Sequence, residues 1–250
     1  MTYFPKSTPL SLSIPKTKPL SKPTVRELLL NITATLQPFP IPAIPTSALA
    51  NIALSQLAAP SHETAARLHV LHVSTRNEVE MMTPSDDAEH KQMTAEGCVH
   101  HLWFTDADNE RLGTRIKWNP TVKTAAHRDA LRQAVLDGRI GIVATDSAPH
   151  LLSKKEGGVL TAASGGPMVQ LLVTTMLEMF SPTTVVDKMC HKPARLFGVD
   201  RRGFIRTGCY AGLALIETKV DYEVTDAIVI SRCGSTPLNG KYLHNRVVTT

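Results

Sequence analysis

Apolar positions between residues 66 and 180 occur in short continuous runs that alternate with amphipathic stretches. Three runs predict buried strands: ARLHVLHVST at 66–75, TAEGCVHHLWF at 94–104 and IGIVAT at 140–145. Three stretches predict helices: RNEVEMM at 76–82, AHRDALRQAVLDG at 126–138 and GPMVQLLVTTMLEMF at 166–180. Because apolar strands that alternate with helices are typical of parallel sheets, the pattern predicts an α/β fold.

The regions on either side have different patterns. Residues 1–60 hold 10 of the 17 prolines, so we expect an irregular segment, or one not native to the fold that follows. A disordered basic tail and a targeting peptide are open alternatives for this segment. After residue 199, the runs GFIRTG, AGLALIE, DAIVISRCG and YLHNRVVTT predict short strands. The predicted units are therefore 1–60, an α/β part at 61–198 and a small β unit at 199–250.

The net charge of +5 lies mainly in residues 1–60, where five basic residues face one acidic residue. The rest of the chain has no basic stripe with interleaved aromatic residues, so we expect no nucleic-acid partner. No run of 18 apolar residues occurs, and we expect no membrane span. The four cysteines show no C-x-x-C spacing, which indicates no disulfide framework and favours a reducing, cytoplasmic compartment.

Candidate chemistry lies where strands end. In GIVATDSAPHLL, residues 141–152, a buried strand ends at Asp146, and His72 lies near the end of an earlier strand. Functional groups of parallel α/β folds gather at such ends, and His with Asp suits a metal-activated water. A hydrogen-bonded core histidine and a turn-capping aspartate are the structural alternatives. The adjacent His100 and His101 would point to opposite faces of a strand, so at most one could join the site. The other histidines in polar surroundings are predicted to be surface residues: His62, His90, His127 and His244.

Several motifs together resemble dihydroorotases, the cyclic amide hydrolases of pyrimidine biosynthesis in the amidohydrolase superfamily. The motifs are LHVLHVST, VHHLWF, IKWNPTVK, ATDSAPH and CHKPARLFGVDRRGFIRTG. The resemblance runs from about residue 62 to the C-terminus. It implies the later strands of a partial (β/α)₈ TIM-type barrel, followed by part of a small β unit.

The resemblance also implies roles for individual residues. His72 and Asp146 match metal ligands, and Asp146 matches the catalytic acid and base. Asn119 and His150 match residues that hold dihydroorotate, and residues 156–167 match a substrate-contacting loop. The implied cofactor is a pair of zinc ions. The implied reaction opens dihydroorotate to N-carbamoyl-aspartate, or closes that product in the reverse direction.

Other ligands that such a site needs are missing from the sequence. Residues 1–71 contain no His-x-His, and only two of six metal ligands can be matched. We therefore expect a truncated or impaired dihydroorotase-like enzyme. One alternative is a non-catalytic, dihydroorotase-like scaffold subunit that braces aspartate transcarbamoylase. The expected partners are therefore the small-molecule substrate and either a second copy of the chain or aspartate transcarbamoylase. Allantoinase and dihydropyrimidinase are further alternatives, ranked lower because their strand-eight motifs usually lack the pair Pro149–His150.

Overall fold

The computed structural model describes residues 11–13, 67–85 and 90–250, and its centre is a four-stranded parallel sheet. The strands lie in the order β1 (Ser11–Ser13), β2 (Leu68–Val73), β3 (Met93–Cys98) and β4 (Ile142–Ala144). The predicted parallel α/β architecture is confirmed. Within the described ranges no strand pairs β4 with β1, so this part of the sheet is open. Apart from β1, the predicted 1–60 segment lies outside the described residues.

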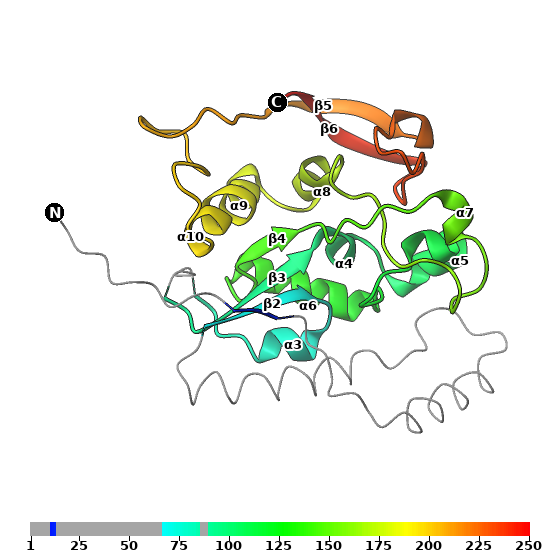
Figure 1. Ribbon diagram of the computed structural model, residues 1–250, viewed down its shortest axis with the longest axis horizontal. Coiled ribbons are helices and arrows are strands. Elements are labelled where there is room, and N and C mark those ends of the chain that lie inside the picture. The colour runs from blue at the N-terminus through cyan, green and yellow to red at the C-terminus, as the bar shows by residue number, and fades with distance from the viewer. Residues whose placement is uncertain (1–10, 14–66, 86–89) are drawn as a thin grey trace.

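Short helices surround the sheet (Figure 1). They are α3 (Arg76–Glu80), α4 (Val99–Trp103), α5 (Asn109–Leu112), α6 (Ala125–Leu136), α7 (Leu152–Lys155), α8 (Leu172–Met179), α9 (Pro182–Val186) and α10 (Lys192–Leu196). A π turn, Asp187–His191, joins α9 to α10. The start of α3 follows from sequence, because Thr75 and Glu78 form a capping box. In the part of the chain that the structure describes, no helix combines the length and apolar character of a membrane span.

The predicted strand at 94–104 is wrong in its second half. β3 ends at Cys98, and residues 99–103 form α4. Val99, Leu102 and Trp103 have the i, i+3, i+4 spacing of a helix, and the first two are fully buried. A short apolar run fits either period, which is why the pattern alone did not separate the two structures.

The predicted helix at 166–180 begins later, at Leu172. Residues 166–171 are instead irregular chain and turn, and Gly166 lies against the ring of Trp118, where a Cβ would be 2.8 Å from Cζ2. Glycine is therefore required at this position, because any side chain would collide with the ring.

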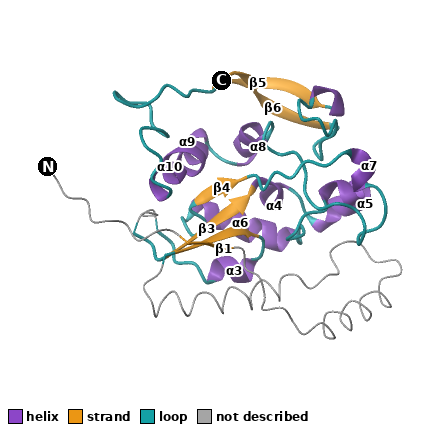
Figure 2. Ribbon diagram, in the orientation of Figure 1, coloured by secondary structure: helices purple, strands orange, loops and turns teal. Residues whose placement is uncertain are grey.

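The C-terminal unit is one antiparallel hairpin rather than several short strands (Figure 2). It comprises β5 (Leu215–Val224) and β6 (Lys241–Thr249), and β6 packs against α8. The predicted strands at 203–208 and 226–234 are wrong, since a 3₁₀ turn, Asp226–Ile228, and irregular chain occupy those positions.

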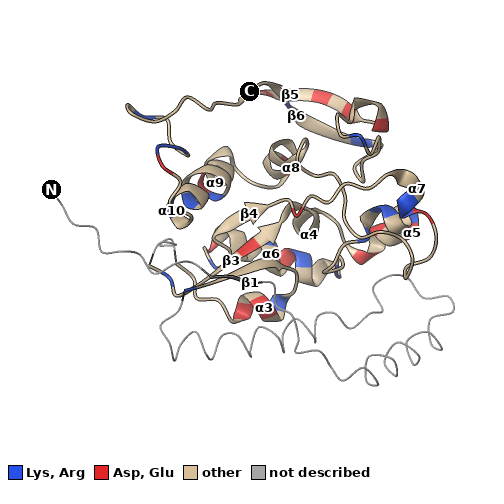
Figure 3. Ribbon diagram, viewed as in Figure 1, with Lys and Arg blue, Asp and Glu red and all other residues tan. Residues whose placement is uncertain are grey.

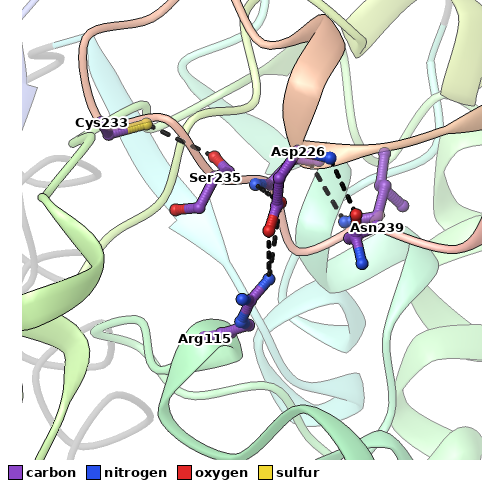
Figure 4. Close-up of polar contacts among 7 residues, drawn as sticks. Arg115, Asp226, Cys233, Ser235 and Asn239 are labelled. Atoms are coloured by element: carbon purple, nitrogen blue, oxygen red, sulfur yellow. Dashed lines mark hydrogen bonds and ion pairs between the residues drawn. The ribbon is translucent and has the colours of Figure 1, made fainter.

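A half-buried ion pair connects the hairpin unit to the rest of the fold (Figure 4). Arg115 lies 3.1 Å from a carboxylate oxygen of Asp226. The same carboxylate accepts the backbone N–H of Thr236 at 2.8 Å, and the backbone N–H of Asp226 donates to Asn239 at 2.8 Å. Asp226 thus fixes the connection between β5 and β6 against the α/β part.

Candidate active site at the carboxyl ends of the strands

His72 lies next to the end of β2 in an unusual backbone conformation. Its φ is 40°, and the register between β2 and β3 shifts between Val70 and Val73. The backbone N–H of His72 donates to the carboxylate of Glu96 on β3 at 3.3 Å. Bulges of this kind occur next to active sites, where they redirect a side chain. Glu96 therefore positions His72, a role that sequence reasoning missed.

Asp146 lies two residues after β4 and also has positive φ, 42°. It is exposed, and the following Ser147 Oγ bridges to the loop beyond by donating to Gly166 O at 3.4 Å. Only four non-glycine residues in the described ranges have positive φ, and His72 and Asp146 are two of them. Because such conformations cost free energy, they concentrate at functional sites. The two residues predicted from sequence are thus both held in strained positions, at the carboxyl ends of the strands that flank β3.

Three further side chains of types that can ligate a metal ion lie at the end of β3 and the start of α4. One ligand atom from each of Cys98, His100 and His101 falls within 4.8 Å of the others. All three side chains are buried. The expectation that His100 and His101 point to opposite faces of a strand is wrong, because these residues are not on a strand. The two histidines belong to α4, and their rings lie 4.2 Å apart.

Electrostatics links this cluster to the two predicted residues. Burial lowers the pKa of His100 well below its usual range, and the neighbouring His101 and His72 lower it further. The pKa of His101 falls to about 3, chiefly through burial. Burial raises the pKa of the Cys98 thiol, and the carboxylates of Glu96 and Asp146 add to the rise. The structure therefore brings His72, Asp146 and the cluster to the same end of the sheet.

The predicted substrate residues lie in adjoining loops. Asn119 is exposed and follows the fully buried Trp118, with a cis peptide bond to Pro120. His150 is half-buried in a narrow crevice that Arg115 and Lys155 also line. Among the described residues, no hydrogen bond or ion pair joins Asn119 or His150 to Asp146.

Four of the remaining histidines, all among the described residues, have structural or surface positions. His90 and His244 are exposed, as predicted. His127 is half-buried and accepts the backbone N–H of Arg76 at 3.0 Å, which satisfies a free donor at the start of α3. His69 is fully buried and pairs with Thr94 at 2.8 Å. His62 lies outside the described residues.

A buried lysine organises the loop beside this crevice. The last turn of α7 is basic (Figure 3) and contains Lys154 and Lys155. Lys155 is 5% exposed and donates to the carbonyl oxygens of Lys117 at 3.1 Å, Ala163 at 3.0 Å and Gly165 at 2.7 Å. Burial, assisted by the charge of Lys117, lowers its pKa to about 8. Nothing in the sequence distinguishes Lys155 from its exposed neighbour Lys154, so this role was not predictable.

We expect Lys155→Met to lower the free energy of unfolding by about 2–3 kcal/mol, since three carbonyl groups lose a charged donor. The loss should depend on pH. The folded-state pKa of about 8 is below the unfolded value near 10.4, so between these values the unfolded state binds more protons. The stability of the native chain should therefore rise with pH in this window, by at most about 1.4 kcal/mol per unit.

Urea denaturation at pH 7, 8, 9 and 10 measures both effects. The Lys155→Met variant should lack the added stability above pH 8, and the difference between the two proteins should widen there. Lys154→Met, one residue away and exposed, is the matched control and should leave stability within about 0.5 kcal/mol. Equal pH slopes for the native chain and Lys155→Met would contradict the assignment.

Gly165 brings the same loop against the residues after Asp146. Its φ is +116°, and a Cβ there would lie 2.5 Å from both the Cβ and the carbonyl oxygen of Ala148. We expect Gly165→Ala to lower the free energy of unfolding by about 1–3 kcal/mol. Gly158→Ala in the same loop meets no atom within 4 Å and should change it little. Comparable losses for the two variants in thermal or urea unfolding would show that the close approach is not needed.

The fold agrees with comparisons to known proteins. The chain belongs to the amidohydrolase family, which it matches over residues 45–242. Within that family it is similar to dihydroorotases, which confirms the resemblance found in its motifs. The dihydroorotase of Lactobacillus gasseri is 29% identical over 197 residues, 76% of this chain and 46% of that protein. The dihydroorotase of Halobacterium salinarum is 33% identical over 183 residues, 71% of this chain and 42% of that protein.

Solved structures give the same fold. The L-hydantoinase (dihydropyrimidinase) of Arthrobacter aurescens matches with a TM-score of 0.79 and 25% identity over 90% of this chain and 52% of that one. A D-hydantoinase (dihydropyrimidinase) from Thermus sp. matches with a TM-score of 0.78 at 18% identity, over 89% of this chain and 52% of that one. These relatives imply a fold of the (β/α)₈ type, of which the described residues form only part. The chain spans about half the length of the relatives that it matches.

Proposed function

We propose that this chain carries the later half of a dihydroorotase-type active site and that it opens cyclic amides slowly by itself. The observation that carries the proposal is the pair His72 and Asp146, held in strained conformations at the ends of β2 and β4. The similarity to dihydroorotases supports dihydroorotate as the substrate.

In the proposed reaction, the carboxylate of Asp146 accepts a proton from the water that attacks the ring carbonyl carbon. The ring C–N bond then breaks, and Asp146 returns the proton to the leaving nitrogen, so that the product is N-carbamoyl-aspartate. Asn119 and His150 are proposed to hold the substrate. His150 shares its crevice with two cationic side chains, Arg115 and Lys155, which suits a carboxylate on the substrate.

The zinc pair that the family implies does not fit the residues described. His72 and Asp146 are proposed as metal donors, but a catalytic zinc ion takes three protein ligands. The donor cluster found in the described part of the chain consists instead of Cys98, His100 and His101. No step of the proposed reaction is therefore assigned to zinc, and a low rate is expected.

The test measures binding and hydrolysis separately on the 250-residue chain. Dihydroorotate should bind, as measured by calorimetry, and should be hydrolysed above the buffer rate but far more slowly than by the Lactobacillus gasseri enzyme. Dihydrouracil and hydantoin, which lack the carboxylate, should bind more weakly. A preference for these neutral rings would favour a dihydropyrimidinase instead.

A non-catalytic scaffold is the second candidate, because only two of the expected metal donors are present among the described residues. It predicts no hydrolysis of any of the three rings. It also predicts a stable complex with aspartate transcarbamoylase, which analytical ultracentrifugation would detect. Hydrolysis without complex formation would exclude the scaffold.

A further inference from the structure

We propose that Cys98, His100 and His101 form a binding site for one transition-metal ion of the zinc type. The cluster is separate from the residues proposed to act on the substrate. It does not depend on the proposed reaction, since it rests on donors within a single segment, the end of β3 and the start of α4.

The geometry is close to that of a coordinated ion. One donor atom from each side chain lies within 4.8 Å of the other two. Donors around a tetrahedral zinc ion, with bonds of about 2.0–2.3 Å, lie roughly 3.3–3.8 Å apart. Small side-chain movements would close the difference. A thiolate with two imidazoles suits Zn²⁺, whereas Mg²⁺ and Ca²⁺ prefer oxygen donors.

The hydrogen bonds of His101 leave a lone pair available. Its Nε2 lies 3.0 Å from the carbonyl oxygen of Pro120. Because a carbonyl can only accept, Nε2 carries the hydrogen, and Nδ1 of the neutral ring keeps its lone pair. Metal-ligating histidines are commonly oriented in this way, by a carbonyl at the other ring nitrogen. Nδ1 of His101 is buried and has no hydrogen-bond partner.

His100 is held in place mainly by packing. Its ring stacks on Trp118 at a centroid distance of 4.3 Å and an angle of 5°. The ring is fully buried, and the backbone carbonyl group of Thr145 acts on it as a hydrogen-bond acceptor, although the contact does not meet full hydrogen-bond geometry. One carbonyl oxygen can accept from only one ring nitrogen, so the other nitrogen of His100 has no partner. A phenyl ring would stack on Trp118 equally well, so packing does not explain this free nitrogen, which a metal ion would satisfy.

The surrounding charge favours a cation. Glu96 and Asp146 both act electrostatically on the Cys98 thiol. These two carboxylates beside the donors attract a divalent ion and offset the loss of its hydration, and binding of the ion would release the proton of the Cys98 thiol. Cys98 and His100 are fully buried and His101 is 2% exposed, so we expect the ion to enter while the chain folds.

Refolding with cobalt tests the site directly, because Co²⁺ occupies zinc sites and has a visible spectrum. The full chain is refolded from urea with Co²⁺, desalted, and measured by elemental analysis and absorption spectroscopy. About one cobalt per chain is expected, with a thiolate-to-cobalt charge-transfer band and the d–d bands of tetrahedral geometry. Zn²⁺ should displace the cobalt and remove both features.

Variants identify the donors. Cys98→Ser should abolish the charge-transfer band and weaken cobalt binding roughly a hundredfold. His100→Phe keeps the stacking on Trp118 and should weaken binding similarly, which covers the case in which Cys98→Ser does not fold. Cys233→Ser is the matched control, because this thiol is also buried and lies outside the cluster, 3.4 Å from the carbonyl oxygen of Ser235.

Any one of three results would disprove the proposed metal site. One is the absence of cobalt after refolding. Another is cobalt bound without the thiolate band, which would place the ion at His72 and Asp146 instead. The third is a band that survives Cys98→Ser or is lost in Cys233→Ser.

Discussion

Replacement of Asp146 by asparagine is expected to reduce dihydroorotate hydrolysis about 10²–10⁴-fold while leaving the fold intact. The amide of asparagine can neither accept the proton of the attacking water nor return it to the ring nitrogen. The backbone should be unaffected, since asparagine tolerates the φ of 42° at this position as readily as aspartate does. The free energy of unfolding is therefore expected to stay within about 0.5 kcal/mol of the native value.

Asp129→Asn is the matched control for this substitution. Asp129 is an exposed aspartate on α6 that pairs only with the adjacent Arg128 at 2.9 Å among the ion pairs described. Its replacement should change stability by less than about 0.5 kcal/mol, and it should leave the rate within about twofold because Asp129 has no proposed role in the reaction. The measurement is the initial rate of dihydroorotate loss for the three proteins at equal concentration. A rate for Asp146→Asn above one tenth of the native rate would show that Asp146 is not the group that transfers the proton.

The strand ends were predictable because the pattern there is simple. An apolar run that ends in a polar residue marks the edge of a buried sheet, and this rule identified both His72 and Asp146 from the sequence. The rule does not give backbone conformation. The positive φ of His72 depends on the register shift between β2 and β3 and on the carboxylate of Glu96, which is distant in sequence.

The cluster at Cys98, His100 and His101 could not be predicted from periodicity. VHHLW fits a strand and a helix equally well, and the choice between them decides where the two histidines point. Tertiary packing favours the helix, because the helix places the ring of His100 against Trp118. The spacing C-x-H-H was nevertheless visible in the sequence, and a search for metal donors without an assumed secondary structure would have found it.

The two groups of donors lead to different expectations for a metal ion. His72 and Asp146 are separated by β3 and lie on strained backbone, as expected of groups that act on a substrate. The cluster is buried and has few hydrogen bonds, as expected of a structural ion that is acquired during folding. An ion at the cluster would stabilise the junction of β3 and α4, and would leave the chemistry at the strand ends to Asp146.

Trp118→Ala is expected to lower the free energy of unfolding by about 3–5 kcal/mol, the largest effect on stability that we predict. The ring is fully buried and contacts three parts of the fold. It stacks on His100 and lies 6.0 Å from the ring of Phe104, and Gly166 crosses it so closely that no Cβ fits there. Its removal would leave a cavity between α4 and the loop at 156–167.

Trp103→Ala is the control, since this second tryptophan is only half-buried. It should lower stability by clearly less, and Trp118→Phe, which keeps a ring against His100, should fall between the two. Urea unfolding followed by circular dichroism gives the three values without depending on tryptophan fluorescence. Because Asn119 follows Trp118 directly, Trp118→Ala should also weaken dihydroorotate binding under conditions where the variant stays folded. Equal losses for the two alanine variants would show that the stacking on His100 does not organise the site.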